Sequence, residues 1–213
     1  MNEPVTPTEP VDRADEAARR ARTEHRTRQI LRAAARLMER SGSHAVSMQA
    51  VAEEAGVSVG LIYRYFSAKE DLLLGVIVEV LAVYEQRVVA AIASSGDDPV
   101  DRLAAGFRVS CEVMDEHRHA ALLTYRESRS LGEQGLATIK RLEAASIEPM
   151  CGVLRDGIAR GVFRPTDVEI VAYDLLVLAH AWTLKHWFFD GRVDLDAYVT
   201  VQFDIVLSGL RAG

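Results

Sequence analysis

The sequence predicts an all-α protein of about nine helices, arranged as a small N-terminal domain and a larger C-terminal body. Residues 47–70 have the pattern of two short helices, each followed by a tight turn, and the start of a third helix. Residues 71–213 continue as helix after helix, separated by Gly, Pro or Asp, with no convincing strand. The length of 213 residues also suits one unit of about 75 residues and a larger one.

The first helix of the 47–70 segment is expected to begin after Ser47, whose hydroxyl can accept a hydrogen bond from a free backbone N–H of the first turn. Its apolar residues recur at three- and four-residue spacing and therefore share one face: Met48, Val51, Ala52 and Ala55. Gly56 is expected to end the helix, because glycine readily adopts the left-handed backbone conformation.

The second helix is expected to begin after Ser58 and to run through Tyr65. Ile62 and Phe66 share its inward face, and Gly60 lets another backbone, or DNA, approach closely. The remaining side chains face outward: Val59, Leu61, Tyr63 and Arg64. A short helix pair of this kind can place its second helix in the major groove of DNA. The segment therefore predicts a protein that reads a DNA sequence.

A capping box is predicted at the start of the third helix, because Ser67 and Glu70 have the required spacing. Lys69 lies in the first turn of that helix, beside backbone N–H groups that favour an anion. A DNA phosphate would suit this position.

These residues resemble the DNA-binding half of the TetR family of one-component bacterial regulators. The matching positions are Ser47, Val51, Ala52, Ala55, Gly56, Val57, Ser58, Gly60, Tyr63, Tyr65, Phe66, Lys69, Glu70 and Leu72. A helix over about 25–40 also fits, so the strong resemblance covers about 50 residues. It implies a three-helix DNA-binding domain with a helix-turn-helix, followed by a helical ligand-binding and dimerisation domain.

The resemblance also implies roles for individual side chains. Phosphate contacts are expected from Ser47, Tyr63, Tyr65 and Lys69, and contacts near base edges from Ser58, Val59, Gly60, Leu61 and Arg64. Relatives often carry a polar or basic residue where this chain has Val59. An apolar side chain can contact the thymine methyl group but reads no hydrogen-bond pattern. Tyr63 and Arg64 are therefore expected to supply most of the polar discrimination, with DNA shape adding to it. Helix packing is the alternative role for Val59 and Leu61.

Positive charge is concentrated in the segment that would bind DNA. The whole chain carries −6, but residues 1–18 carry −4, residues 19–70 carry +5 and residues 71–213 carry −7. Attraction to phosphates requires positive charge near the DNA. Five arginines lie at or before the start of the first helix: Arg19, Arg20, Arg22, Arg26 and Arg28. They could reach phosphates or a minor groove as an N-terminal arm, or form the solvated, charged start of the helix.

Three domains are predicted: a disordered, basic-ended tail over residues 1–22, the DNA-binding domain over 23–70 and the body over 71–213. Cys111 and Cys151 are too few for a disulfide framework and are expected to be buried in a reducing cytoplasm. The sequence has no N-terminal apolar segment typical of a signal peptide. A cytoplasmic location is therefore expected.

Six helices are predicted in the body, over about 69–93, 98–115, 118–130, 134–160, 166–189 and 195–210. Asp98 is expected to cap the second of these, with Pro99 at its first position. Thr166 and Glu169 form a second predicted capping box, at the start of the fifth helix.

The 166–189 helix is apolar nearly all round, so we expect it to be buried on both sides. Its polar residues argue against a membrane span. In a TetR-like body it would pack on its own core and on the twin helix of a second subunit. The resemblance thus implies a homodimer through the last two helices, including Tyr198, Val201, Ile205 and Leu207. A two-fold dimer suits an operator that is an inverted repeat in double-stranded DNA.

A small-molecule pocket among the middle helices of the body is also implied, with a ligand that favours a dimer geometry unsuited to the operator. Candidate lining residues are Phe107, Cys111, Met114, Leu122, Tyr125, Arg126, Trp182, His186 and Trp187. Aromatic, methionine and a few polar side chains suit an apolar ligand with one polar end. Each of these residues is explained equally well as part of the core or an interface.

The effector class is predicted from residues 125–131 and 161–165, which resemble segments of TetR relatives that respond to acyl-CoA thioesters. Arg126 could pair with a phosphate or carboxylate of such a ligand, or with a nearby acid such as Glu127. We therefore expect a repressor released by an acyl-CoA or fatty-acid-like effector, with a drug-like or aromatic inducer as the alternative. An activator would share the same DNA-binding domain.

Catalytic chemistry is the weaker hypothesis. The sequence has no Cys-x-x-Cys, no HExxH and no phosphate-cradling glycine loop. His117 and His119 are two residues apart and so do not share a helix face. No metal, cofactor or catalytic residue is predicted. If the protein were a helical enzyme, its active site would have to be a pocket lined by Tyr125, Glu127 and His186.

Overall fold

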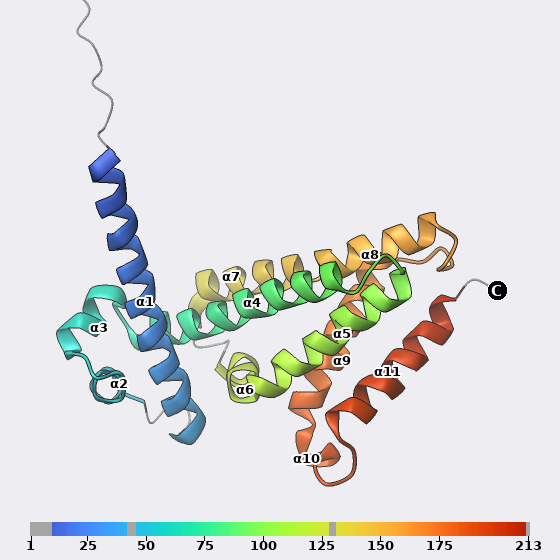
Figure 1. The fold of residues 1–213 in the computed structure, drawn as a ribbon. Helices are drawn as coiled ribbons and strands as arrows, with labels where there is room; N and C mark the ends of the chain where they lie inside the picture. The colour runs from blue at the N-terminus through green and yellow to red at the C-terminus, as the bar shows by residue number, and fades with distance from the viewer. Residues whose placement is uncertain (1–9, 42–45, 128–130, 212–213) are drawn as a thin grey trace, which may run out of the picture. The chain divides into compact units, whose positions relative to one another are not determined.

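The computed structural model describes residues 10–41, 46–127 and 131–211 (Figure 1). Within these ranges the chain forms eleven helices and no strand. The all-α fold class is therefore confirmed. The chain divides into two compact units, with the division after Leu72.

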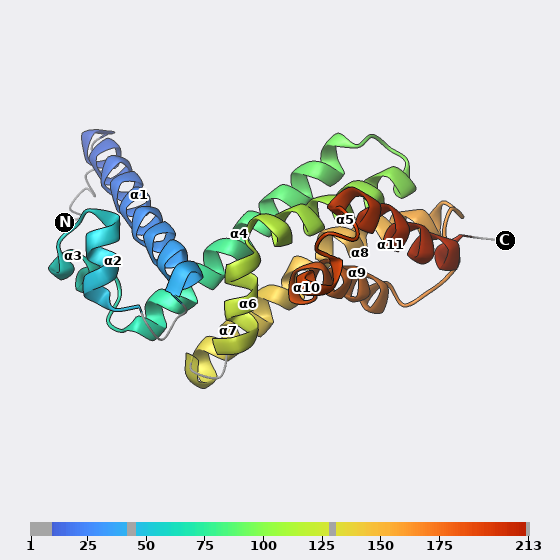
Figure 2. The ribbon, with the colours of Figure 1, turned by 90° about the horizontal axis from the view of Figure 1, so that it is seen from below.

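The first unit contains α1 (Pro10–Ser41), α2 (Met48–Ala55) and α3 (Val59–Tyr65). α1 packs against α2, and α2 packs against α3 (Figure 2). The core between them is made of buried residues at helical spacing: Ile30, Ala33, Ala34 and Met38 from α1, Val51 and Ala52 from α2, and Ile62 from α3. The helix-turn-helix is thus held by an apolar core of its own.

The turns of the first unit follow the predicted chemistry. The Ser47 hydroxyl accepts a hydrogen bond from the Ala50 N–H at 3.1 Å, and the Ser58 hydroxyl accepts one from the Leu61 N–H at 3.2 Å. Each serine therefore caps the helix that follows it. Gly56 has a φ of 65°, in the left-handed region, and ends α2 as expected.

The N-terminal tail is shorter than predicted. Residues 10–22, assigned to the tail from the sequence, form the first turns of α1, whereas residues 1–9 lie outside the described residues. Pro10 stands at the helix start, where its missing N–H leaves no hydrogen bond unmade. Alanine and arginine, which favour helix, fill the following turns, and Arg20 pairs with Glu16 one turn earlier.

Eight further helices follow: α4 (Lys69–Ser94), α5 (Pro99–Glu116), α6 (Arg118–Glu127), α7 (Gly132–Ser146), α8 (Glu148–Ala159), α9 (Val168–Leu184), α10 (His186–Phe189) and α11 (Leu195–Leu210). In the second unit, α5 packs against α8, α9 and α11. Leu103, Phe107 and Cys111 of α5 are completely buried in the resulting core. Asp98 caps α5 and Pro99 opens it, as predicted.

Two helices that were predicted as continuous are divided. The 134–160 segment forms α7 and α8, because Pro149 lacks an N–H for an interior position and stands in the first turn of α8 instead. The 166–189 segment forms α9 and α10, with Lys185 between them at φ −113° and ψ 20°. The last residues of the predicted 118–130 helix, 128–130, lie outside the described residues.

Both predicted capping boxes use another residue. At α4, the Asp71 carboxylate accepts hydrogen bonds from the N–H groups of Ser67 and its neighbour, each at 3.1 Å, so Asp71 takes the place predicted for Glu70. At α9, Asp167 caps the helix in place of Thr166. In both cases a carboxylate provides the acceptor at a helix start, where the helix dipole favours negative charge.

The last two long helices each have a buried and an exposed apolar side. On α11, Tyr198 and Leu207 are buried within their own chain, so the prediction that they belong to an interface is wrong, because both side chains pack into the core of the second unit. Val201 and Ile205 are instead 56% and 61% exposed. No helix in the described part of the chain is long and apolar enough to cross a membrane.

Candidate functional site

α3 carries the predicted base-reading residues on its accessible side. Ile62 is fully buried, whereas Tyr63 is 56% exposed and Arg64 is also exposed. The other residues predicted near base edges are exposed (Ser58, Gly60) or half-buried (Val59, Leu61). A partner molecule can therefore reach every one of them without unfolding the unit.

Of the residues predicted to contact phosphates, Tyr63 lies within α3 and the other three lie at helix ends. Ser47 and Lys69 stand at the starts of α2 and α4, and half-buried Tyr65 ends α3. The Ser47 oxygen already accepts a backbone hydrogen bond, but its hydroxyl proton remains available to donate to a phosphate oxygen. Lys69 adds a positive charge at a helix start, where backbone N–H groups also favour an anion.

Within the described residues, no atom packs against the position that a side chain of Gly60 would occupy. A Cβ atom built on this glycine would meet no heavy atom within 4 Å. The folded chain therefore does not itself require glycine at this position of α3. Close approach by an external partner is a physical reason for a glycine here.

Residues 56–60 have the spacing Gly-x-Ser-x-Gly, which in hydrolases marks a strand-turn-helix that presents a nucleophilic serine. Here the segment joins two helices, and the Ser58 hydroxyl caps α3. The local structure is thus a helix-turn-helix, which lacks the strand of a nucleophile elbow.

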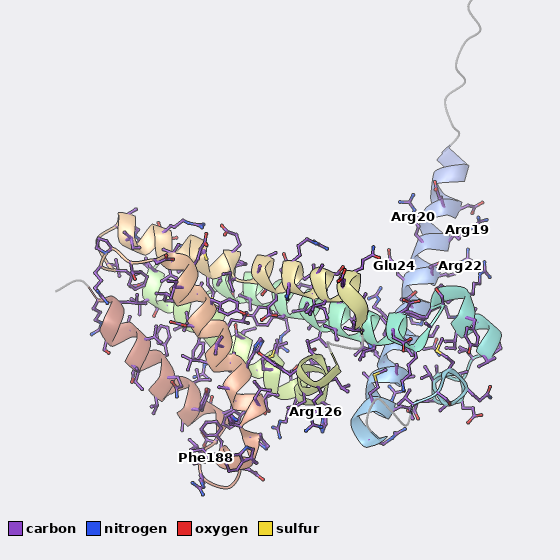
Figure 3. The ribbon with its side chains drawn as sticks, turned by 180° about the vertical axis from the view of Figure 1, so that it is seen from behind. Arg19, Arg20, Arg22, Glu24, Arg126 and Phe188 are labelled. Carbon is purple, nitrogen blue, oxygen red and sulfur yellow. The ribbon has the colours of Figure 1, made fainter. Side chains whose placement is uncertain are left out.

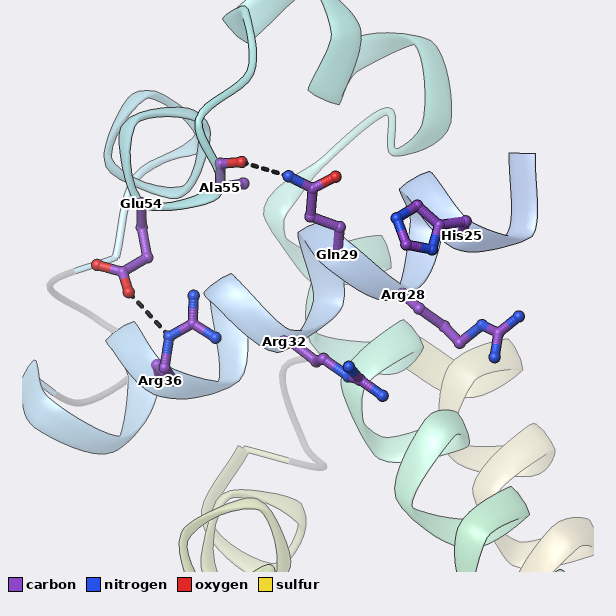
Figure 4. A pocket seen from close by; sticks show the side chains of 7 residues that line it. All are labelled: His25, Arg28, Gln29, Arg32, Arg36, Glu54 and Ala55. Carbon is purple, nitrogen blue, oxygen red and sulfur yellow. Dashed lines mark hydrogen bonds and ion pairs between the residues drawn. The ribbon is translucent and has the colours of Figure 1, made fainter. Parts of the chain in front are cut away.

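A polar hollow of about 250 Å³ lies where α1 meets the end of α2 (Figure 4). Gln29 donates a hydrogen bond to the Ala55 carbonyl at 2.7 Å, and Arg36 donates one to Glu54 at 2.9 Å. Arg40 binds the second oxygen of Glu54 at 2.7 Å. The hydrogen bond from Arg36, and then that from Arg40, lowers the pKa of the Glu54 carboxyl. These contacts fasten α1 to α2 and so hold the base of the helix-turn-helix.

The second unit contains a cavity of about 320 Å³ between α4, α5, α6, α7 and α9. Its lining residues are Ile77, Val80, Leu81, Met114, Ala121, Thr124, Tyr125, Leu136, Ile139, Lys140, Glu143, Tyr173 and His180. Most of the walls are apolar, with a few polar groups among them. This composition is typical of a site for a small, mainly apolar molecule.

Tyr125 and His180 form the polar contact that joins two walls of the cavity. The Tyr125 hydroxyl lies 2.7 Å from the His180 Nδ1, and the rings meet edge to face at 5.7 Å. Burial lowers the pKa of His180 to about 4 and raises that of Tyr125 to about 12. At neutral pH both groups are therefore uncharged, and the hydroxyl can donate to an unprotonated Nδ1.

Only two of the nine residues predicted for the pocket, Met114 and Tyr125, line this cavity. The seven that lie elsewhere are Phe107, Cys111, Leu122, Arg126, Trp182, His186 and Trp187. Trp182 is buried and donates its indole N–H to Asp115 at 2.7 Å. Arg126 is exposed on α6 (Figure 3), and Trp187 is 76% exposed on α10. Side-chain chemistry alone did not indicate which side of each helix faces the cavity.

The sequence did contain a signal for the missed residues. Tyr173 and His180 are seven positions apart, so they share one face of α9. Lys140 and Glu143 are three apart on α7, and Tyr173 donates a hydrogen bond to Glu143 at 3.2 Å. On the mostly apolar α9, two polar residues that share a face were the cue to this wall.

The 161–165 segment has a packing role in the structure. Phe163 is 1% exposed and lies against Gly157, where an added Cβ would come within 2.2 Å of the ring. Gly161 adopts a φ of 70°, and the N–H groups of Val162 and Phe163 bond to the Gly157 carbonyl. The segment ends α8 in a left-handed turn.

An exposed recognition helix in one unit and an effector-sized cavity in another define a class of protein, the helix-turn-helix regulators with a separate helical body. Residues 30–76 match the family described as "Bacterial regulatory proteins, tetR family", and residues 96–210 match "Tetracyclin repressor-like, C-terminal domain". The chain belongs to the TetR family, and it is a DNA-binding transcriptional regulator.

Two relatives align with this chain over most of its length and most of their own. The HTH-type transcriptional regulator HbdR of Aromatoleum sp. (strain CIB) is 36% identical over 176 residues, which is 83% of this chain and 76% of the relative. The HTH-type transcriptional repressor KstR2 of Mycolicibacterium smegmatis is 27% identical over 216 residues, or 97% and 95% of the two chains.

The fold also matches that of the transcriptional regulator FadR from Bacillus subtilis, solved in complex with stearoyl-CoA. That match has a TM-score of 0.73 at 23% identity and covers 85% of this chain and 97% of FadR. At this identity the likeness establishes the shared fold alone.

Proposed function

We propose that this regulator is a cytoplasmic homodimeric repressor that leaves an inverted-repeat operator when a small apolar effector fills the cavity of the second unit. The observation that carries the proposal is one chain with both an accessible recognition helix and a cavity of about 320 Å³. The cavity has a binding role in this proposal, and no catalytic step is assigned to it.

The recognition helix α3, the starts of α2 and α4, and α1 supply the DNA contacts. Phosphates are held by Ser47, Tyr63, Tyr65 and Lys69, and base edges are met by Ser58, Val59, Gly60, Leu61 and Arg64. Arg26 adds a phosphate contact from α1. Arg64 and Tyr63 are exposed and polar, so they provide hydrogen bonds that Val59 and Leu61 cannot.

Dimerisation uses the exposed apolar sides of the last two long helices. Ile170 and Val177 of α9 and Val201 and Ile205 of α11 are all exposed in the single chain. Apolar residues in such numbers on adjacent helices favour burial against a partner. A two-fold dimer of this kind presents two copies of α3 to the two halves of an inverted repeat.

The effector is an acyl-CoA or fatty-acid-like molecule whose apolar part occupies the cavity. The mostly apolar walls support this, as does the stearoyl-CoA bound by the FadR neighbour of the same fold. Lys140 in the wall and Arg126 on the adjoining α6 supply positive charge for an acidic end group. The ligand weakens DNA binding only to the extent that it prefers the conformation unsuited to the operator.

The test begins with an operator selected from random-sequence DNA by the full-length protein. Fluorescence anisotropy then measures its affinity over a range of salt concentrations, with and without acyl-CoA thioesters of increasing chain length, fatty acids and aromatic compounds. Release by one group of acyl chains supports the proposed effector. Release by an aromatic compound alone replaces it with a drug-like inducer, and failure to select any sequence contradicts the repressor function.

A further inference from the structure

The N-terminal turns of α1 have one face on which charges are paired. Arg20 lies 3.3 Å from Glu16, and Arg28 lies 3.9 Å from Glu24, each pair one helical turn apart. Residues at this spacing share a face of the helix. The positive charge on this side is therefore offset by neighbouring carboxylates of the same helix.

A second face carries arginines that form no ion pair in the described part of the chain, although Asp15 lies one turn before the first of them. Arg19, Arg22 and Arg26, here called the α1 basic strip, recur at spacings of three and four residues. In the part of the chain that the structure describes, none of them contacts a carboxylate: Arg22 bonds to a backbone carbonyl of α1, and Arg26 to a side-chain amide. Arg19 and Arg22 project toward the side of α3, away from Arg20 and Glu24 (Figure 3).

The strip meets the recognition helix in a hollow of about 330 Å³. Its lining residues are Arg19, Arg22, Thr23 and Arg26 from α1, and Arg64 and Tyr65 from α3. Four guanidinium groups thus surround one open space with no acidic side chain in its lining. Their mutual repulsion is relieved by an anion, and the planar guanidinium group matches phosphate oxygens in two-point hydrogen bonding.

We propose that the α1 basic strip binds the phosphate backbone of the operator beyond the base pairs that α3 reads, and so lengthens the DNA site. This inference rests on the proposed function, because Arg64 and Tyr65 must face the same DNA. Arg19 and Arg26 are about 10 Å apart along the helix axis, a length over which one DNA strand rises by about three nucleotide steps. As part of a helix, the strip loses less conformational entropy on binding than a flexible arm would.

A pair of double variants isolates the strip. Arg19→Gln with Arg22→Gln removes two unpaired arginines, whereas Arg20→Gln with Arg28→Gln removes two paired ones from the other face. Both variants have the same net charge. We expect the strip variant to bind the selected operator about tenfold more weakly, with a salt slope lower by about 0.9 for each lost phosphate contact. The control variant should stay close to the parent protein.

The length of the DNA duplex provides a second, independent test of contact between the α1 basic strip and DNA. Trimming the operator to the inverted repeat should weaken the parent protein and leave the strip variant unaffected. Replacing the same two arginines by lysine should preserve most of the salt slope, because the contact depends on charge. Circular dichroism checks that helix content is unchanged.

The outcomes separate the two hypotheses. If the parent protein selects no DNA sequence, the proposed function itself fails. If the parent binds selectively but both glutamine variants lose affinity equally, or trimming has no effect on the parent, the strip does not contact DNA and only this inference is overturned.

Discussion

At the scale of single residues, Gly60 is a position where folding does not require glycine but the proposed DNA contact does. Space around its missing side chain is empty, so an alanine fits without strain. Alanine also favours helix over glycine by about 1 kcal/mol. We expect Gly60→Ala to raise the thermal unfolding temperature or leave it unchanged, yet to weaken operator binding by about tenfold, because a methyl group separates α3 from the bases.

Gly152→Ala is the matched control for this change. Gly152 also lies in a helix, α8, and has no heavy atom within 4 Å of a Cβ atom. It belongs to the second unit, so its replacement should add similar stability without altering operator affinity. Equal DNA binding by both alanine variants, measured by anisotropy, would show that Gly60 is not at the contact.

His180 makes stability depend on pH. Burial lowers its pKa to about 4 from an ordinary value of 6.5, so the unfolded chain binds the proton more readily than the folded one. Stability from this group is complete above about pH 6.5 and is lost as the pH falls toward 4, by up to about 3 kcal/mol.

Urea unfolding of the parent protein and of His180→Gln, at pH 7 and pH 4.5, measures this contribution. The parent should lose more free energy of unfolding than the variant over this interval, since carboxylate titrations are common to both. An identical loss in both proteins would mean that His180 is protonated as easily in the folded state as in the unfolded one.

Residue types in the sequence predicted several helix caps and turns correctly. They did not predict which side chains pack into the core and which line the cavity. Ser47, Ser58 and Gly56 were identified because capping and left-handed turns depend on neighbours in sequence. Trp182 and Phe107 were assigned to a pocket and belong to the core instead. That distinction depends on which helices are adjacent, and contacts such as Tyr125 with His180 join residues 55 positions apart.

At the scale of helices, the cavity can be blocked from one wall. Thr124 of α6 lines the cavity and donates its hydroxyl to the Ala120 carbonyl at 2.9 Å. A phenylalanine at this position would occupy part of the 320 Å³. We expect Thr124→Phe to bind the operator like the parent protein but to need about tenfold or more effector for release, because filling the site removes ligand contacts.

Thr138→Phe is the control for the cavity variant. Thr138 on α7 is also half-buried and also bonds to the carbonyl four residues earlier, but it does not line the cavity. Effector titrations of both variants, followed by operator anisotropy, should separate them. A normal response by Thr124→Phe would move the effector to another site.

The helices themselves were largely predictable, and their interruptions were not. Periodicity and caps placed α5 almost to the residue, since Asp98 and Pro99 are strong start signals. The break at Lys185 has no glycine or proline at that position, and tertiary packing outweighs helix propensity there. The break before α8 had its signal in Pro149, which a continuous apolar pattern concealed.

At the scale of the whole molecule, charge and apolar surface are distributed for different partners. Residues 19–70 carry +5, which favours DNA, and residues 71–213 carry −7, which discourages it. We therefore expect the acidic body to repel DNA, which favours contact through the first unit. The body's exposed apolar side chains on α9 and α11 favour a second copy of the chain instead.

We expect the affinity for the operator to depend on the stability of the dimer. Val201→Glu with Ile205→Glu places two charges on the exposed apolar side of α11, where burial against a partner would leave them unpaired. We expect this variant to be monomeric by analytical ultracentrifugation and to lose about a hundredfold or more in operator affinity, because each monomer then holds only half of the site.

Val89→Glu provides the comparison, since Val89 is a similarly exposed valine (47%) on α4, away from the proposed interface. It should remain dimeric and bind the operator normally. Because both variants add negative charge to the same unit, a loss of DNA binding in both would indicate a general electrostatic effect. A loss confined to the α11 variant, accompanied by dissociation, ties recognition of the inverted repeat to the pairing of two chains through their last helices.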